Sequence, residues 1–513
     1  MSSTQAQVSF FSQRRAGVLL HPTSLPCSES RYLEGTTAFG TLGKEAYRFI
    51  DFMAEAGLSV WQMLPTGPTH QDLSPYQSIS AHAGNPDLIS FDWLIEQGWI
   101  PAESVHLFSP DRTNLAIARQ QAGASFFAFI QTEYGASVAQ TYHAFCAAQA
   151  YWLDDVSLFC ALRNHFQQQS WTTWPEGLRQ HDQQALSAAR QELAPEVAQV
   201  CFEQFAFFQQ WQSLRNYAQK KSIYLFGDIP IFVAHDSADV WAEQGSFLLD
   251  EAGQPMSVAG VPPDYFSETG QHWGNPHYDW DVMRADNFRW WLARLKTQLE
   301  LFDLIRIDHF RGFEAYWSIP GDTQDARQGE WIKAPGEALL NACFAAYPDL
   351  PLVAENLGVI TDEVEALRKQ FALPGMLVLQ FAFDGNPNPA NPHLPHNHSL
   401  ADVIYSGTHD NDTSLGWYAS LNDFSRQQLR SYCFHSSDAM PWLLINLALS
   451  SVGRMAIIPM QDFMELDGRH RMNMPGTTDK NWVWTFDWDQ VDPGLATRIR
   501  QQLATYHRLV NQV

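Results

Sequence analysis

The sequence predicts an α/β protein whose core is a (β/α)8 TIM barrel with helical insertions between the barrel strands. Eight short apolar runs end in polar residues, and patterns of amphipathic helices lie between several of them. Near-continuous apolar runs are typical of strands buried on both faces, which is the environment of a parallel sheet. Eight strand–helix units favour closure into a barrel, where functional side chains lie at the carboxyl ends of the strands.

The expected strands are spaced along the whole chain. They occupy residues 16–22, 58–65, 222–230, 302–310, 350–358, 375–385, 401–411 and 454–462. Apolar residues recur three and four positions apart in several connecting segments, which predicts helices there. These helical segments include residues 43–59, 287–302, 361–375 and 441–453.

Two connections are longer than a barrel crossover needs. Residues 67–220 separate the second and third strands and have mainly helical patterns, so we expect a helical insertion subdomain there, with residues 1–66 and 221–513 forming the barrel. The second long connection, residues 231–301, contains the stretch GVPPDYFSETGQHWGNPHYDW, residues 260–280, which has neither helical nor alternating periodicity. It is expected to be an irregular surface loop of the kind that covers or lines a binding site.

The charge balance narrows the range of partners. With 32 basic and 56 acidic residues the net charge is −24, and no Lys/Arg-rich stripe compensates for it, so nucleic acid and anionic membranes are unfavourable partners. A neutral substrate is more compatible with this charge. The chain has no apolar run of about 18 residues and no secretory signal at its N-terminus, so we expect a cytoplasmic protein without a membrane span. The sequence does not predict an oligomeric state.

Motifs for a cofactor or a metal are not found. The six cysteines contain no Cys-x-x-Cys pair and are expected to be free thiols. His393, His396 and His398 lie in a Pro-rich loop without acidic or cysteine neighbours, which argues against a metal site. There is neither a phosphate-binding glycine motif nor a nucleophilic-serine elbow, so we expect no cofactor.

Carboxylates follow four of the predicted strands and would meet at one mouth of the barrel. They are Asp228, Asp308, Glu355 and Asp410. Like charges around one mouth push their pKa values apart, which suits a division into an acid and a nucleophile. Alternation along the strand places Arg306 on the same face as Asp308, and an adjacent guanidinium favours the ionised carboxylate. A buried ion pair that serves only the fold is an equally acceptable interpretation of that pair.

Other candidate residues also allow a structural interpretation. An apolar stretch precedes Glu355, so burial would raise its pKa as a general acid requires, but Glu355 or Asn356 could instead cap the following helix. His409 lies in the stretch SGTHDND, which would also make an ordinary turn. Tyr76 and Trp273 are aromatic residues in polar loops, where they could stack on a ligand or pack onto the barrel.

Six stretches together resemble one known family. The chain contains RIDHFRG, AENLG, GTHDND, GVPPDYF, GQHWGNPHYDW and RMNMPG, and is similar in them to the 4-α-glucanotransferases called amylomaltases or disproportionating enzymes, glycoside hydrolase family 77. The resemblance implies a cofactor-independent barrel enzyme that moves α-1,4-glucan segments between maltooligosaccharides or starch-like glucans through a covalent glycosyl-enzyme. It implies that Asp308 is the nucleophile, Glu355 the acid/base and Asp410 a third carboxylate that stabilises the transition state.

The resemblance also implies a set of sugar-binding positions. These are Arg306, His409, Tyr76, Gln271, Trp273, Asp384 and Asn473. Within this set we expect Trp273, with residues 260–276, to form an acceptor platform and lid. Two alternatives stay open: an α-amylase-type hydrolase with the same three acids, in which water replaces the acceptor sugar, and a glucan-binding protein without turnover. Acids at all three positions count against the second alternative.

Overall fold

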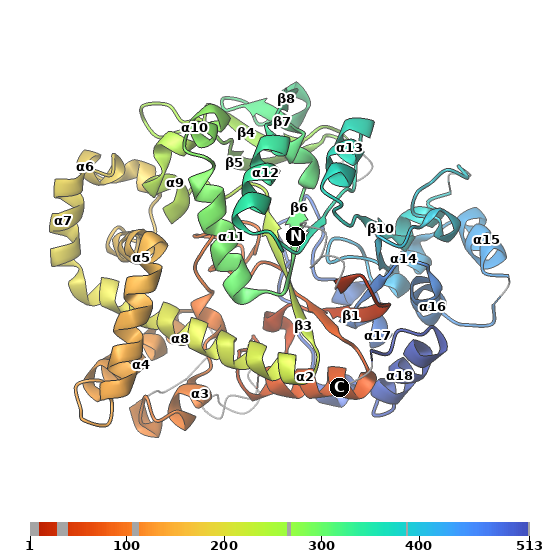
Figure 1. Ribbon diagram of the computed structural model, residues 1–513, viewed down its shortest axis with the longest axis horizontal. Helices are drawn as coiled ribbons and strands as arrows, with labels where there is room; N and C mark the ends of the chain where they lie inside the picture. The colour runs from red at the N-terminus through yellow and green to blue at the C-terminus, as the bar shows by residue number, and fades with distance from the viewer. Residues whose placement is uncertain are drawn as a thin grey trace.

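The computed structural model describes residues 10–27, 39–104, 112–263, 268–385, 388–434 and 436–510. Eight parallel strands form its central sheet, and each overlaps one of the eight apolar runs, so the strand predictions are confirmed. Figure 1 shows several of these strands in the centre of the molecule. The strands are β1 (Arg15–Leu19), β2 (Val60–Gln62), β3 (Tyr224–Pro230), β6 (Leu304–Asp308), β9 (Leu352–Ala354), β10 (Met376–Val378), β11 (Val403–Tyr405) and β12 (Met455–Pro459).

The sheet closes almost completely into the predicted barrel. Its strand order is β10-β11-β12-β1-β2-β3-β6-β9, so β9 and β10 meet at a seam. Across the seam the Ala354 N–H donates to the Pro374 carbonyl oxygen, and the Met376 N–H donates to Asn356 Oδ1, both at 2.8 Å. A side-chain amide therefore supplies a hydrogen bond that a strand ladder would otherwise make, directly beside Glu355.

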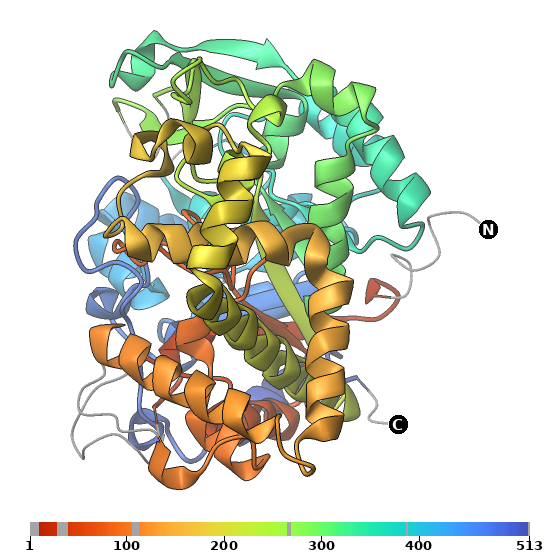
Figure 2. The same cartoon turned by 90° about the vertical axis from the view of Figure 1, so that its left-hand side faces the viewer.

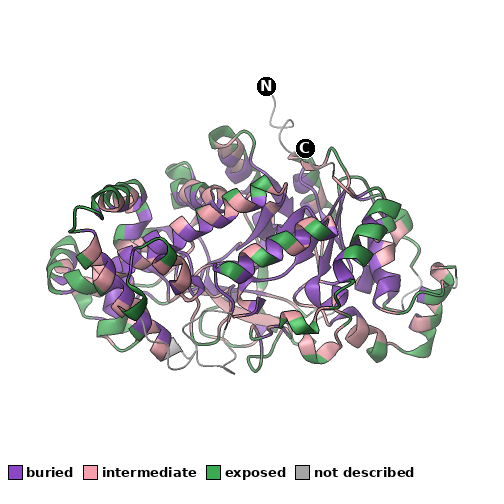
Figure 3. Ribbon diagram, turned by 90° about the horizontal axis from the view of Figure 1, so that it is seen from below, coloured by how far each residue is buried: buried purple, intermediate pink, exposed green. Residues whose placement is uncertain are grey.

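Helices cover the outside of the barrel and bury one face each. In α2 (Lys44–Ala56) the buried face includes Phe49, Ile50 and Met53, and all five residues of β12 are buried beneath such helices. Figure 3 shows buried strands inside and exposed outer faces on the surrounding helices. The four helical segments expected from periodicity are confirmed as α2, α11, α13 and α16. Together with α2, the helices of the barrel part are α9 (Ala238–Ala242), α10 (Trp280–Ala285), α11 (Arg289–Leu301), α12 (Gly336–Ala346), α13 (Asp362–Gln370), α14 (Ser414–Ser420), α15 (Asp423–Tyr432), α16 (Trp442–Ser450), α17 (Met460–Phe463) and α18 (Leu495–Thr505).

The long connection between β2 and β3 is mainly helical, as its pattern indicates. Its helices are α3 (Phe91–Glu96), α4 (Arg112–Phe129), α5 (Ala136–His165), α6 (Glu176–Arg179), α7 (Gln183–Glu192) and α8 (Ala194–Lys220). Figures 1 and 2 show them together on one side of the barrel, with α8 alongside β3. Trp211 of α8 is buried and donates from Nε1 to the Leu301 carbonyl oxygen at 2.8 Å, so one hydrophobic core continues from these helices into the barrel. An independent subdomain over residues 67–220 stays a prediction.

A second sheet, which the sequence did not indicate, lies beside the barrel mouth. It is antiparallel, has the order β5-β4-β7-β8, and is drawn at the top of Figure 1. Its strands are β4 (Ser257–Val261), β5 (Gln271–Pro276), β7 (Ala315–Pro320) and β8 (Glu330–Lys333). The expectation of an irregular loop over residues 260–280 was therefore wrong in part, because β4 pairs with the distant β7 as well as with β5. Residues 264–267 of that stretch lie outside the described residues.

No helix in the described ranges combines the length and the apolar composition that crossing a bilayer requires.

Candidate active site

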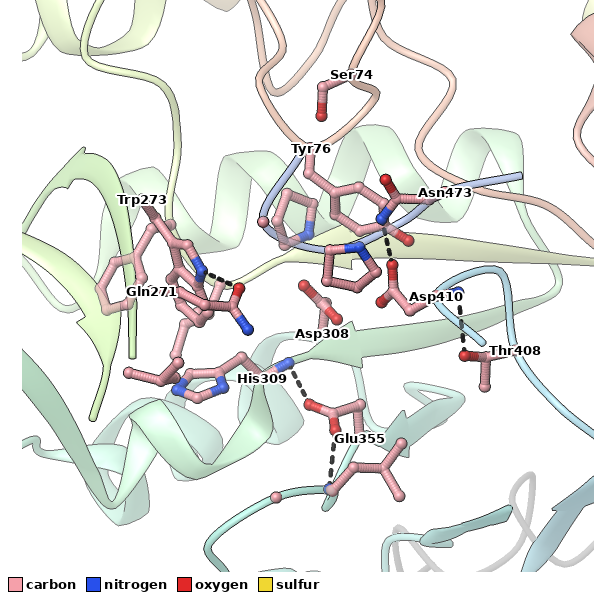
Figure 4. A pocket seen from close by; sticks show the side chains of 18 of the residues that line it. Ser74, Tyr76, Gln271, Trp273, Asp308, His309, Glu355, Thr408, Asp410 and Asn473 are labelled. Atoms are coloured by element: carbon pink, nitrogen blue, oxygen red, sulfur yellow. Dashed lines mark hydrogen bonds between the residues drawn. The ribbon is translucent and has the colours of Figure 1, made fainter. Parts of the chain in front are cut away.

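A cavity of about 360 Å3 lies between the carboxyl ends of the barrel strands and the antiparallel sheet. Three predicted carboxylates line it: Asp308 at the end of β6, Glu355 directly after β9, and Asp410 in the loop after β11. Figure 4 shows Asp308 in the middle, with Glu355 and Asp410 on different sides of it. Because a barrel places the carboxyl ends of its strands around one mouth, residues from distant parts of the sequence meet in this cavity.

Arg306 forms ion pairs with both Asp308 and Asp228. Its Nη2 lies 2.7 Å from Asp308 Oδ1, and its Nη1 lies 2.5 Å from Asp228 Oδ2. Asp228 and Arg306 are almost fully buried, whereas the Asp308 side chain is 27% exposed. Burial raises the pKa of Asp308 to about 6, and the Arg306 guanidinium opposes this rise. Arg306 thus makes both the buried structural pair, with Asp228, and the pair that faces the cavity.

Glu355 is the most enclosed of the three carboxylates. It is 7% exposed, and its two oxygens accept hydrogen bonds from the backbone N–H groups of His309 at 2.7 Å and Leu357 at 2.8 Å. Burial raises the pKa of Glu355 to about 7, although Arg306 and the two N–H groups favour the ionised form. Glu355 does not cap a helix, because α13 begins only at Asp362.

The backbone conformation of His309 orients its N–H toward Glu355. His309 has φ 53° and ψ 49°, a left-handed conformation that is unfavourable for a residue with a Cβ. This turn ends β6 and points the His309 N–H at Glu355. Trp273 of β5 packs edge-on against the His309 ring, with centroids 4.9 Å apart, so the second sheet braces the strained turn.

Asp410 lies in a different electrostatic environment. Asn473 donates from Nδ2 to Asp410 Oδ1 at 2.6 Å, and His409 Nε2 lies 3.3 Å from Asp410 Oδ2. Burial alone would raise the pKa of Asp410, but His409 and the hydrogen bonds from His409 and Asn473 outweigh burial and lower the pKa to about 2. Asp410 is therefore a carboxylate throughout the neutral pH range.

Tyr76 connects the two sides of the site. Its hydroxyl donates to Asp228 Oδ2 at 2.7 Å and lies 2.9 Å from His409 Nε2, and its ring stacks on the imidazole with centroids 5.2 Å apart. A phenol has one proton, which goes to Asp228, so His409 Nε2 must carry the proton of its contact with Tyr76. A continuous chain of polar contacts therefore runs Asp308–Arg306–Asp228–Tyr76–His409–Asp410.

The other predicted sugar-binding residues divide into two groups. Gln271, Trp273 and Asn473 line the cavity, and Gln271 Oε1 accepts a hydrogen bond from Trp273 Nε1 at 3.1 Å. His409 is buried and is not part of the cavity lining, but it contacts Tyr76 and Asp410, which are. Asp384 is exposed after the short helix η8 (Leu379–Phe383) and is not part of the lining.

Several residues of the cavity wall were not predicted from the sequence, among them Arg311 and Trp331. Arg311 lies within the stretch RIDHFRG, so its position three residues after Asp308 was an available signal. Trp331 on β8 belongs to no motif, and nothing in the sequence near it indicated a binding site.

The described residues contain no group of three or more His, Cys, Asp or Glu side chains arranged to hold a metal ion. The three histidines of the Pro-rich loop have other partners. His393 Nδ1 accepts from the Val378 N–H, His396 contacts the Tyr432 hydroxyl, and His398 contacts Ser451 Oγ.

Comparisons with known proteins agree with this geometry. A sequence model of the 4-alpha-glucanotransferase family, glycoside hydrolase family 77, matches residues 20–489. The 4-alpha-glucanotransferase of Thermus thermophilus is 45% identical over 97% of this chain and 99% of its own length, and that of Synechocystis is 44% identical over 97% and 99%. The structure of an amylomaltase from Streptococcus agalactiae in complex with acarbose superposes with a TM-score of 0.90 at 34% identity, covering 97% of this chain and 100% of the other. The chain belongs to the 4-alpha-glucanotransferase family and is an enzyme of that class.

Proposed function

We propose that this enzyme transfers α-1,4-glucan segments between maltooligosaccharides or starch-like glucans by a retaining double displacement. The observation that carries the proposal is the contrast between Asp308 and Glu355. Asp308 is paired with Arg306 and partly exposed, whereas Glu355 is enclosed and has the higher pKa. Near neutral pH this contrast favours a carboxylate at Asp308 and a protonated acid at Glu355, which is the division that a retaining mechanism requires.

The first displacement cleaves the donor. Asp308 Oδ2 attacks the anomeric carbon from the face opposite the leaving sugar, because Oδ1 is held by Arg306. Glu355 gives its proton to the glycosidic oxygen as the bond to the anomeric carbon breaks, and the leaving chain departs with a free 4-hydroxyl. The product of this step is a β-glycosyl ester on Asp308, with Glu355 as a carboxylate.

The second displacement rebuilds an α-bond. Glu355, now ionised, accepts the proton of an acceptor 4-hydroxyl, and that oxygen attacks the anomeric carbon. The ester bond breaks, its electron pair returns to Asp308, and both carboxyl groups regain their starting protonation states. Two inversions at one carbon give net retention.

Asp410 stabilises the positive charge that develops on the sugar ring in both steps. A fixed negative charge in an enclosed site lowers the energy of an oxocarbenium-like transition state without reorganising. Its pKa of about 2 supports this role, since the group stays ionised while Glu355 cycles between acid and base.

Hydrolysis of the α-amylase type follows the same two steps with water as the acceptor. Family membership favours transfer over hydrolysis. Transfer also requires that a bound acceptor orients its hydroxyl, since positioning raises the effective concentration of a reacting group far above that of the free molecule. Trp273 and Gln271, which line the cavity beside the carboxylates, are suited to bind that acceptor.

Incubation with maltotriose alone tests the proposal. Each transfer breaks one glycosidic bond and forms another, so we expect glucose and a ladder of longer maltooligosaccharides, with an almost constant number of reducing ends. Chromatography measures the products and a reducing-sugar assay counts the ends, with Asp308→Asn as the inactive control. Reducing ends that rise with every bond cleaved would establish the hydrolase alternative instead.

We also propose that the enzyme is located in the cytoplasm. All six cysteines are free thiols, which a reducing compartment favours.

A further inference from the structure

Trp331 is an aromatic side chain of the cavity wall that the reaction described above does not use. It lies on β8, is 37% exposed, and lines the same cavity as Trp273. β5 and β8 are opposite edges of the antiparallel sheet, so three interstrand steps separate their backbones by about 14 Å. Trp331 and Trp273 therefore start from opposite edges of the sheet and occupy separate positions in the cavity wall.

Arg311 fixes the Trp331 ring. The guanidinium carbon lies 3.7 Å from the ring centroid, and Nη1 donates to the Val359 carbonyl oxygen. Arg311 is only 5% exposed, forms no ion pair with another described residue, and its Nε has no hydrogen-bond partner among those residues. A buried cation stacked on a half-exposed ring makes a rigid platform, which loses little conformational freedom on binding.

The loop after Glu355 indicates on which side of the cleaved bond Trp331 lies. The proton of Glu355 goes to the oxygen that joins donor and leaving group, so the leaving group and the later acceptor lie on the Glu355 side. Leu357 and Val359 lie two and four positions after Glu355 and line the cavity, and the Val359 carbonyl oxygen accepts the hydrogen bond from Arg311. Trp331 is thereby tied, through Arg311 and Val359, to the acceptor side.

We propose that Trp331, held by Arg311, is an acceptor-side platform that binds a glucose unit of the incoming α-glucan beyond the unit nearest Trp273. The apolar face of a sugar ring packs on an exposed indole, and the neutral ligand leaves the neighbouring cation undisturbed. This inference rests on the proposed function. Its consequence is a preference for long acceptors that is separate from the chemistry at the carboxylates.

The test varies acceptor length at a fixed donor. Trp331→Ala, Trp331→Phe and the unmodified enzyme receive saturating α-maltotriosyl fluoride and increasing concentrations of end-labelled glucose, maltose, maltotriose or maltotetraose, and initial rates of transfer are measured. Tyr134→Ala is the matched control, since Tyr134 is 90% exposed and is not part of the cavity lining. Trp331→Phe keeps an aromatic ring and should therefore retain most of the binding of the longer acceptors.

Trp331→Ala should raise the half-saturating concentration of the longer acceptors by about five- to tenfold and leave that of glucose within about twofold. Equal changes for glucose and maltotetraose, or no change for either, would overturn the platform. A second series varies the fluoride donor at a fixed, saturating concentration of maltotetraose. A change in the half-saturating donor concentration alone would place Trp331 on the donor side and also overturn the platform. Failure of the proposed function is distinguishable, because the unmodified enzyme would then release fluoride without labelling any acceptor.

Discussion

The barrel mouth and the antiparallel sheet face the same cavity with different kinds of side chain. At the mouth, Arg306 and Tyr76 connect three carboxylates in one chain of ion pairs and hydrogen bonds that ends at Asp410. The sheet instead presents the aromatic residues Trp273 and Trp331. Fixed charges stabilise a transition state, whereas ring faces bind neutral sugars without changing their reactivity.

The difference indicates a division of labour between the two walls. Substitutions at the mouth should lower the rate of bond cleavage for every acceptor, because both proposed displacements use the same carboxylates. Substitutions in the sheet should change which acceptor is used while cleavage continues.

Asp308→Asn should have the largest effect. The amide has nearly the shape of the carboxylate but cannot form the glycosyl ester, so we expect turnover of maltotriose to fall by at least about 10^4-fold. Thermal unfolding should change little, because the buried Arg306–Asp228 pair remains. Rates come from product chromatography, and folding from circular dichroism. Turnover within tenfold of the unmodified enzyme would rule out Asp308 as the nucleophile.

Glu355→Gln should lower turnover of maltooligosaccharides by about 10^2- to 10^4-fold, the usual contribution of a general acid and base. An α-glycosyl fluoride needs no protonation of its leaving group, so the first displacement with this donor should be largely preserved. A burst of fluoride release measures that step. An equal loss on the fluoride and on maltotriose would contradict the role of Glu355 as the acid.

Tyr76→Phe tests whether the polar chain acts as a unit. The substitution keeps the ring that stacks on His409 and removes the hydroxyl that donates to Asp228. Hydrogen bonds to charged groups contribute about 1.5–3 kcal/mol, so we expect kcat to fall by roughly ten- to a hundredfold with little change in KM. Asp228→Asn is the matched variant at the other end of the same bond, and a double mutant should lose less than the sum of the two. Additive losses would show that the two residues act independently.

The pH dependence of transfer follows from the two coupled carboxyls. Asp308 must be ionised, so activity falls as the pH drops through about 6, and Glu355 must be protonated, so activity falls as the pH rises through about 7. We expect a narrow bell-shaped profile of kcat/KM with its maximum between these values, each limb belonging to the pair as a whole. The alkaline limb should disappear in Glu355→Gln assayed with a glycosyl fluoride. An alkaline limb that persists in Glu355→Gln would belong to an ionisable group other than Glu355.

The barrel was predictable because its strands are buried on both faces and therefore appear as contiguous apolar runs. The antiparallel sheet was not, since β4 contains Gly and β5 contains both Gly and Pro. The sheet also depends on pairing between β4 and β7, and β7 follows only after β6, the strand that ends at Asp308. Short strands of this kind have no periodicity of their own. Their pairing is specified by distant residues that a local pattern cannot show.

The site shows the same limit. Asp308, Glu355 and Asp410 were found because each follows a strand, and a barrel brings strand ends together. The hydrogen bond from Tyr76 to Asp228 joins residues 152 positions apart, one of them in a loop, so only the folded chain reveals it. Asp384, chosen by resemblance alone, lies outside the cavity lining, and its role stays a prediction.

Trp273→Ala has the smallest expected effect and separates the two walls most directly. Trp273 packs against His309 and lines the cavity beside the carboxylates, so its loss removes binding of the first acceptor unit and leaves the charges in place. Water should then capture more of the glycosyl-enzyme, and the ratio of transfer to hydrolysis should fall by about three- to tenfold, with glucose as acceptor affected as strongly as maltotetraose. That pattern differs from Trp331→Ala, for which glucose should be unaffected. The ratio comes from labelled product against free reducing ends, with Trp273→Phe as the control that keeps a ring. If transfer and hydrolysis fall together in Trp273→Ala, the sheet supports the chemistry itself, through the strained turn at His309, and the division between the two walls is wrong.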